Sequence, residues 1–173
     1  MKQIKRTRYI TFCALMSALS VVVLLLGSLL EILDLTAVML AAIILVIVYE
    51  EVKKGALSVY FVTLVIAFIL VPNKLVACEY CVIAIYPIIK PIFDRLSPVL
   101  MYTVKGLYMV LTTLAIVLLM KYVFISESPL YLDVIFAVGG VVMLILFDVL
   151  IFRFTMYYRF KLRNQLKIDK FFY

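Results

Sequence analysis

The chemically distinctive residues of this chain lie within long apolar segments, where a charged side chain is costly. Glu79 is one of them, and Tyr86 and Lys90 follow at seven and eleven positions, a spacing that places all three on one face of a helix. A carboxylate there, beside Tyr80 and Tyr86, could line a substrate cavity and bind a cationic or hydrogen-bond-donating group. Alternatively, Glu79 is an interfacial carboxylate that reaches outer water or pairs with Lys74.

Two later apolar segments carry a second pair of charges. Lys105 and Asp148 lie at comparable depths near the same end of their segments. An ion pair between them would remove two isolated charges from lipid and hold two helices together. We expect this structural role rather than a proton relay, since a relay usually needs several titratable groups at mid-depth.

Soluble enzyme chemistry and metal binding find little support. The chain has no histidine, and it contains no Gly-rich phosphate loop or nucleophile elbow. Cys78 and Cys81 form a Cys-x-x-Cys, but zinc would need two further ligands and the third cysteine, Cys13, lies near the opposite membrane face. We therefore expect packing cysteines, no metal or cofactor, and no enzymatic activity, so that any ATP hydrolysis would come from a partner.

Long apolar runs must position these side chains. The 173 residues are 68% hydrophobic, with a mean hydropathy of +1.23. Residues 9–30 contain no charged side chain, and as a helix they would span about 33 Å, the thickness of a bilayer core. A cleaved signal peptide would have a shorter apolar region and a better cleavage site than residues 24–31 offer. The sequence therefore predicts one all-α membrane domain over residues 1–173.

Charges, prolines and glycines divide the rest of the chain into further apolar segments, the fourth being interrupted by Pro87 and Pro91. The second segment is short, about 22 Å as a helix, so we expect local thinning of the bilayer, help from flanking residues or only a half-span. A basic cytoplasmic tail, 155–173, follows the last segment. The division predicts six transmembrane helices: residues 9–30, 35–49, 55–71, 75–93, 98–124 and 131–154.

Lysines and arginines favour one orientation, because cytoplasmic loops carry the excess of these residues. With six spans, only Lys74 and Lys121 of the 17 basic residues fall on the outer side. We therefore expect both termini in the cytoplasm. This bias, together with contact with anionic lipids, accounts for the net charge of +7 without nucleic-acid binding.

Small residues mark one face of the first segment near its cytoplasmic end. Ala14 and Ala18 are four positions apart, with Thr11 one turn earlier, so they share a face that another helix could approach closely. The simplest interpretation is packing within the bundle. Docking of a partner helix is the second.

In this layout the chain resembles the substrate-binding S components of energy-coupling-factor vitamin transporters. The resemblance rests on six spans in 19.8 kDa, cytoplasmic termini, a basic leader and the Ala14/Ala18 pair. It implies the capture of a small molecule such as a vitamin or precursor, with Ala14 and Ala18 docking on a transmembrane T component that two ATPases drive. No signature of a particular vitamin subfamily is present, so the substrate stays open.

The resemblance also assigns a role to polar residues of the outer loops. In S components the outer loops close over the ligand, whereas the simpler explanation is that loops are polar because they contact water. The candidates for gating are Glu31, Asp34, Asn73 and Lys74.

Residues 24–36, 70–74 and 86–90 resemble a pattern of small membrane proteins of Gram-positive bacteria. This suggests a multi-pass protein of a bacterial plasma membrane but implies no activity. Two other functions stay open. One is a non-transporting scaffold of the cell envelope, similar in size and topology to rod-shape-determining membrane proteins, and the other is an enzyme acting on lipid headgroups.

Overall fold

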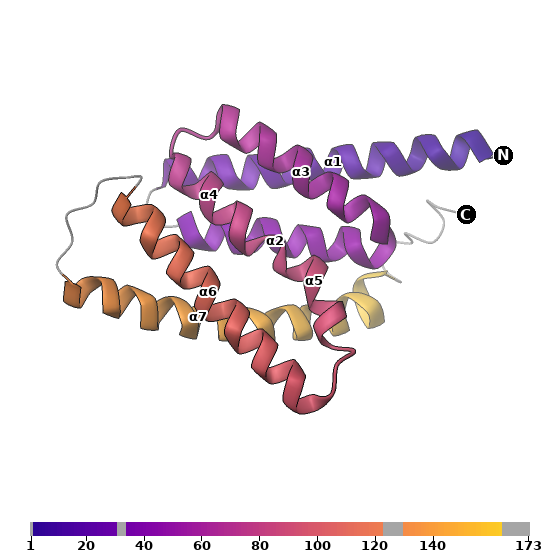
Figure 1. Cartoon of the computed structure of the whole chain (residues 1–173). Helices are drawn as coiled ribbons and strands as arrows, with labels where there is room; N and C mark the ends of the chain where they lie inside the picture. Colours follow the sequence, from indigo (N-terminus) through magenta and orange to yellow (C-terminus); the bar gives the residue numbers. More distant parts are fainter. Residues whose placement is uncertain (1, 31–33, 123–129, 164–173) are drawn as a thin grey trace.

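The computed structural model describes residues 2–30, 34–122 and 130–163. Within these ranges every regular element is a helix, and no strand is present, so the all-α prediction is confirmed for this part of the chain (Figure 1). The helices are α1 (Lys2–Leu29), α2 (Asp34–Glu51), α3 (Lys53–Leu70), α4 (Lys74–Ile83), α5 (Tyr86–Phe93), α6 (Pro98–Tyr122) and α7 (Leu130–Tyr157), which continues into the π-helical turn η1 (Tyr158–Leu162).

Among the described residues, five helical stretches are long and apolar enough to cross a membrane. The segment predicted as the second span, which forms α2, is not among them, because Asp34, Glu50 and Glu51 all lie within its 18 residues. The structure therefore defines a helical membrane protein. The membrane-length stretches are Thr7–Leu29, Lys53–Leu70, Lys74–Phe93, Pro98–Tyr122 and Asp133–Leu162.

Helix α2 forms the core of the bundle. It packs against α1, α3, α4, α5 and α7, and eight of its 18 residues are buried. Ala37, Ala41 and Ala42 are among them, and small side chains let neighbouring helices approach closely. A helix that is apolar all round is a buried one, which explains why this short segment is so hydrophobic.

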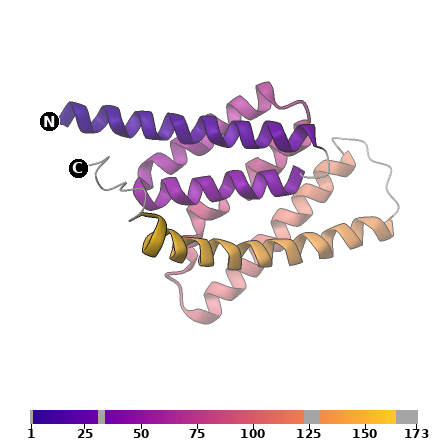
Figure 2. The same cartoon turned by 180° about the vertical axis from the view of Figure 1, so that it is seen from behind.

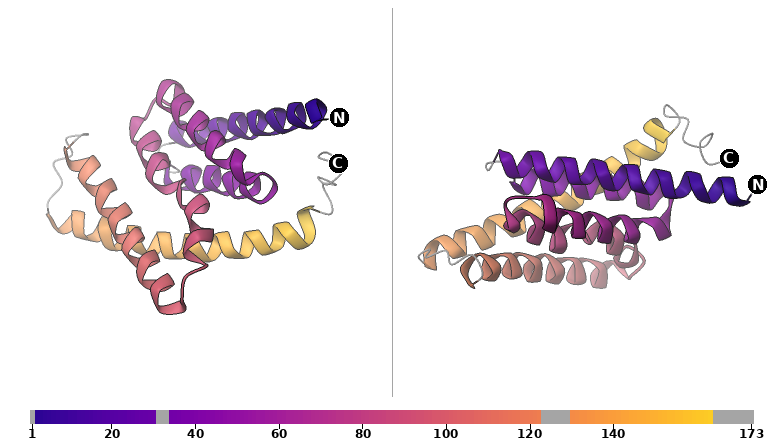
Figure 3. Two further views of the ribbon diagram at one scale, coloured as in Figure 1. Left: turned by 45° about the vertical axis from the view of Figure 1, so that its right-hand side comes forward. Right: turned by 90° about the horizontal axis from the view of Figure 1, so that it is seen from above.

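The α6–α7 hairpin lies apart from α1 and α3 and packs on α2, α4 and α5 (Figure 3). Gly140 allows α7 to approach α6 closely, because a Cβ atom at this position would lie 2.6 Å from Cγ2 of Thr113. The N-terminal end of α1 and the C-terminal end of α7 lie at the same end of the bundle (Figure 2).

A break divides the segment expected over 75–93. Helix α4 ends at Ile83 and α5 begins at Tyr86, with Pro87 in the first turn of α5. Proline lacks the N–H group of a helical hydrogen bond, and its ring clashes with the carbonyl four residues earlier, here that of Ile83. The single helical face expected to carry Glu79 and Lys90 together is therefore interrupted between them.

Candidate functional site

A cavity of about 430 Å³ lies between α2, α4, α6 and α7. Its volume falls in the range of small-molecule binding sites. Helix α2 contributes Leu35 and Met39, and α4 contributes Glu79 and Ile83. The remaining wall consists of Thr113, Ile116, Val117 and Met120 of α6 and of Ile135, Phe136, Gly139, Gly140, Met143 and Leu144 of α7.

Of the described residues that line the cavity, Glu79 alone is charged. It is 7% exposed, and its Oε2 atom is buried without a hydrogen-bond partner among the described residues. The alternative pairing with Lys74 is not formed, because the Lys74 ammonium donates to the carbonyl oxygens of Phe68 and Val71 at 2.8 and 2.9 Å. Since an uncompensated carboxylate is costly in an apolar site, Glu79 marks the cavity as the candidate binding site.

Two residues proposed for gating meet beside the cavity. The Asn73 amide donates from Nδ2 to Oδ2 of Asp34 at 2.8 Å, and its Oδ1 atom accepts from the backbone N–H of Leu75, which caps α4. The backbone N–H of Asn73 also donates to Oγ of Ser28 at 3.2 Å. The chain before α4 is thus tied to the start of α2 and the end of α1, whereas Glu31 lies outside the described residues.

Tyr80 belongs to the packing between α3 and α4 and not to the cavity wall. Its ring is fully buried and stacks on Tyr60, with the ring centroids 5.8 Å apart. The Tyr60 hydroxyl in turn donates to the carbonyl oxygen of Cys81 at 2.7 Å. One residue is a rotation of about 100° on a helix, so Tyr80 points away from the side on which Glu79 lies.

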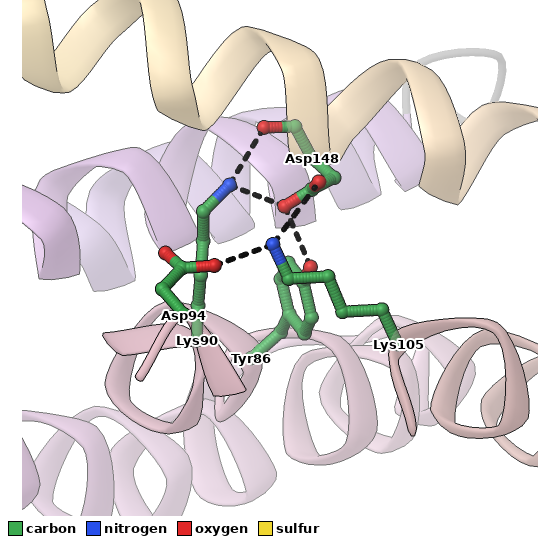
Figure 4. Close-up of polar contacts among 5 residues, drawn as sticks. All are labelled: Tyr86, Lys90, Asp94, Lys105 and Asp148. Carbon is green, nitrogen blue, oxygen red and sulfur yellow. Dashed lines mark hydrogen bonds and ion pairs between the residues drawn. The ribbon is translucent and has the colours of Figure 1, made fainter. Parts of the chain in front are cut away.

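Tyr86 and Lys90 belong to a separate polar cluster with Asp94, Lys105 and Asp148 (Figure 4). The Tyr86 hydroxyl donates to Oδ1 of Asp148 at 2.6 Å, and the Lys90 ammonium pairs with the same carboxylate. Lys90 also donates to the backbone carbonyl of Asp148 at 2.9 Å. The structure thus places Tyr86 and Lys90 in this cluster, beyond the break between α4 and α5, and neither residue lines the cavity with Glu79.

The same cluster contains the pair expected from the sequence. Nζ of Lys105 lies 3.7 Å from Oδ2 of Asp148 and 2.5 Å from Oδ1 of Asp94. Two lysines therefore balance two aspartates, and together they join α5, α6 and α7 (Figure 4). Sequence reasoning missed Asp94, although its position four residues after Lys90 was a possible signal, since such spacing places two side chains on one side of a helix.

Ala14 and Ala18 lie on the face of α1 that points away from the rest of the bundle, where both are exposed. The buried face of α1 carries Ser17, Ser20 and Leu24 instead. Packing of the alanine pair within the bundle, the simplest interpretation of the sequence, is therefore not what the structure shows.

Comparisons of the chain with protein-family models, with curated proteins and with solved structures find no match. The fold and the cavity define a class, a helical membrane protein with a small-molecule-sized cavity that contains one buried carboxylate.

Proposed function

We propose that this protein captures a small molecule in the Glu79 cavity, as the substrate-binding subunit of an importer of the energy-coupling-factor kind. The observation that carries the proposal is Glu79, a charged residue that lines a cavity of about 430 Å³ and whose buried Oε2 atom has no hydrogen-bond partner in the described part of the chain. A buried polar atom without a partner costs free energy, and a ligand group that donates to it removes that cost.

The proposal includes six spans with both termini in the cytoplasm. Helix α2 would be the span that brings the number from five to six, since its 18 residues extend about 27 Å and its charges lie only at its ends. An even number of spans agrees with the common location of the ends of α1 and α7 (Figure 2). The distribution of lysines and arginines supports a cytoplasmic location of that end, and Glu79 would then lie in the outer half of the membrane.

A transmembrane partner with two ATPases would supply the energy. Its proposed docking surface is the face of α1 that points away from the bundle. Ala14 and Ala18 are exposed there in the cytoplasmic half of the helix, with Leu15 and Leu19 beside them at 60% and 47% exposure. Small residues on an exposed face permit close approach of another helix within lipid.

The test is to purify the protein in nanodiscs, extract it with organic solvent and identify retained small molecules by mass spectrometry. We expect one compound retained by the wild type and lost in Glu79→Gln, which keeps the side-chain shape and removes the charge. Glu50→Gln is the matched control, because Glu50 pairs with Arg159 away from the cavity. Equal retention by wild type and Glu79→Gln would overturn the assignment of the site, and an empty wild-type protein would favour a scaffold.

A further inference from the structure

We infer that the ligand of the Glu79 cavity is a cationic amphiphile, one ammonium group on an apolar body, and that it reaches the cavity sideways from the outer leaflet. The inference rests on the proposed function, because it names the substrate class of the same cavity. Three observations support it: the composition of the wall, the sign of its one charge, and the residues that border the opening.

The wall of the cavity can satisfy very few polar groups. In the part of the wall that the structure describes, only Glu79 and Thr113 have polar side chains, and the Thr113 hydroxyl already donates to the carbonyl oxygen of Met109 at 2.8 Å. A nutrient with many hydroxyl, amide or carboxylate groups would lose its hydration without gaining partners. A molecule with one polar head and an apolar body matches this wall.

The sign of the charge follows from what surrounds Glu79. The nearest cation in the sequence is Lys74, and its ammonium group donates to the carbonyl oxygens of Phe68 in α3 and of Val71, which follows α3. Lys90 and Lys105 pair with the aspartates of the polar cluster. An ammonium group would therefore form a charge-assisted hydrogen bond with a carboxylate whose Oε2 atom has no partner among the described residues.

The route into the cavity follows from its border on α7. Ile135 and Phe136 line the cavity and are 61% and 57% exposed, so the opening has an apolar edge that would contact hydrocarbon. Gly139 lies on the same edge, and a Cβ atom at this position would meet no atom within 4 Å. The hydrogen bond between Asp34 and Asn73 does not belong to this border, since neither residue lines the cavity. An amphiphile in the leaflet can therefore approach without displacing polar contacts.

The test uses photolabelling of the full-length protein in phosphatidylcholine nanodiscs. The probe is dodecylamine with a diazirine in the middle of its chain, and labelled peptides are identified by mass spectrometry. We expect labels on residues 113–120 of α6 and 135–144 of α7. Unlabelled dodecylamine should displace the probe, whereas dodecanol at the same mole fraction should not.

Variants test the geometry. Glu79→Gln should reduce the specific labelling about tenfold, the effect of losing one charge-assisted contact. Gly139→Leu should reduce it similarly by filling the opening. Gly106→Leu is the matched control, because Gly106 is exposed on α6, meets no atom within 4 Å and does not line the cavity. Competition on the wild-type protein needs no variant and so does not depend on folding.

The outcomes separate the inference from the proposed function. Displacement by dodecanol as effective as by dodecylamine, or full labelling of Glu79→Gln, would overturn the cationic class. Displacement by butylamine at the same aqueous concentration would overturn the amphiphile and its route while leaving capture at Glu79 intact. A molecule that is retained in a Glu79-dependent way but has no ammonium group would overturn the cationic amphiphile and leave capture at Glu79 intact. Absence of specific labelling together with an empty purified protein would overturn both.

Discussion

Replacing Asp148 with asparagine should destabilise the protein by about 3 kcal/mol. The carboxylate accepts from Tyr86, pairs with Lys90 and lies 3.7 Å from Lys105. The Lys90 and Lys105 side chains are only 8% and 11% exposed, and Lys105 keeps its contact with Asp94, so neutralising Asp148 leaves the Lys90 charge without its carboxylate partner inside the bundle. Removing one partner of a buried ion pair costs about 3–5 kcal/mol, and the lower value applies because Asp148 is 23% exposed.

The assay is reversible unfolding in mixed micelles, followed by the circular dichroism of the helices. The double variant Asp148→Asn/Lys90→Met should recover part of the loss, since it removes the uncompensated charge together with its partner. Lys121→Gln is the control, because the Lys121–Asp133 pair is 3.2 Å long and Lys121 is 40% exposed, so its loss should cost under about 1 kcal/mol. If Asp148→Asn cost no more than Lys121→Gln, the polar cluster would not hold α5, α6 and α7 together.

Three further predictions concern other parts of the chain. Ala18→Leu should leave the free energy of unfolding unchanged, because Ala18 is exposed. It should abolish co-purification of a transmembrane subunit and two ATPases from native membranes, and an intact assembly would contradict the docking role of Ala18. Gly140→Val should lower stability by about 2 kcal/mol in the same unfolding assay, since its Cβ would meet Thr113 at 2.6 Å, and an unchanged midpoint would mean that α6 and α7 separate easily. Asn73→Ala should cost about 1 kcal/mol through loss of the cap of α4 and of the bond to Asp34, and faster backbone hydrogen exchange in residues 74–77 would locate the effect.

Much of the helical architecture is predictable because apolar runs and charges delimit the helices. The segment predicted over 98–124, for example, forms α6 at Pro98–Tyr122. The position of α2 in the core could not be predicted, since a buried helix and a transmembrane helix have the same apolar composition. The tail expected from residue 155 begins as a continuation of α7 into η1, where Arg159 pairs with Glu50 at 2.7 Å. That contact joins residues more than a hundred positions apart, and no local pattern indicates it.

The candidate site was predictable only in part. The cost of a charge in lipid was enough to select Glu79 from the sequence. Helical spacing assigns Tyr86 and Lys90 to the face of Glu79, but they lie about two and three turns further along the chain and contact Asp148 of α7 instead of lining the cavity. The cavity wall on α6 and α7 depends on how this hairpin packs on α2 and α4, and a single sequence does not contain that pairing.

The orientation of the alanine pair shows the same limit. Spacing places Ala14 and Ala18 on one face of α1, but it does not reveal whether that face points into the bundle or outward. Only the packing of α1 against α2 and α3 decides this, by burying Ser17, Ser20 and Leu24 instead.

The central claim is that the Glu79 carboxylate holds a ligand, and native mass spectrometry of the protein released from nanodiscs tests it most directly. The account predicts a bound mass on the wild-type protein and on Glu50→Gln, and its loss from Glu79→Gln. A wild-type protein without a bound mass, or an equal bound mass on Glu79→Gln, would contradict it.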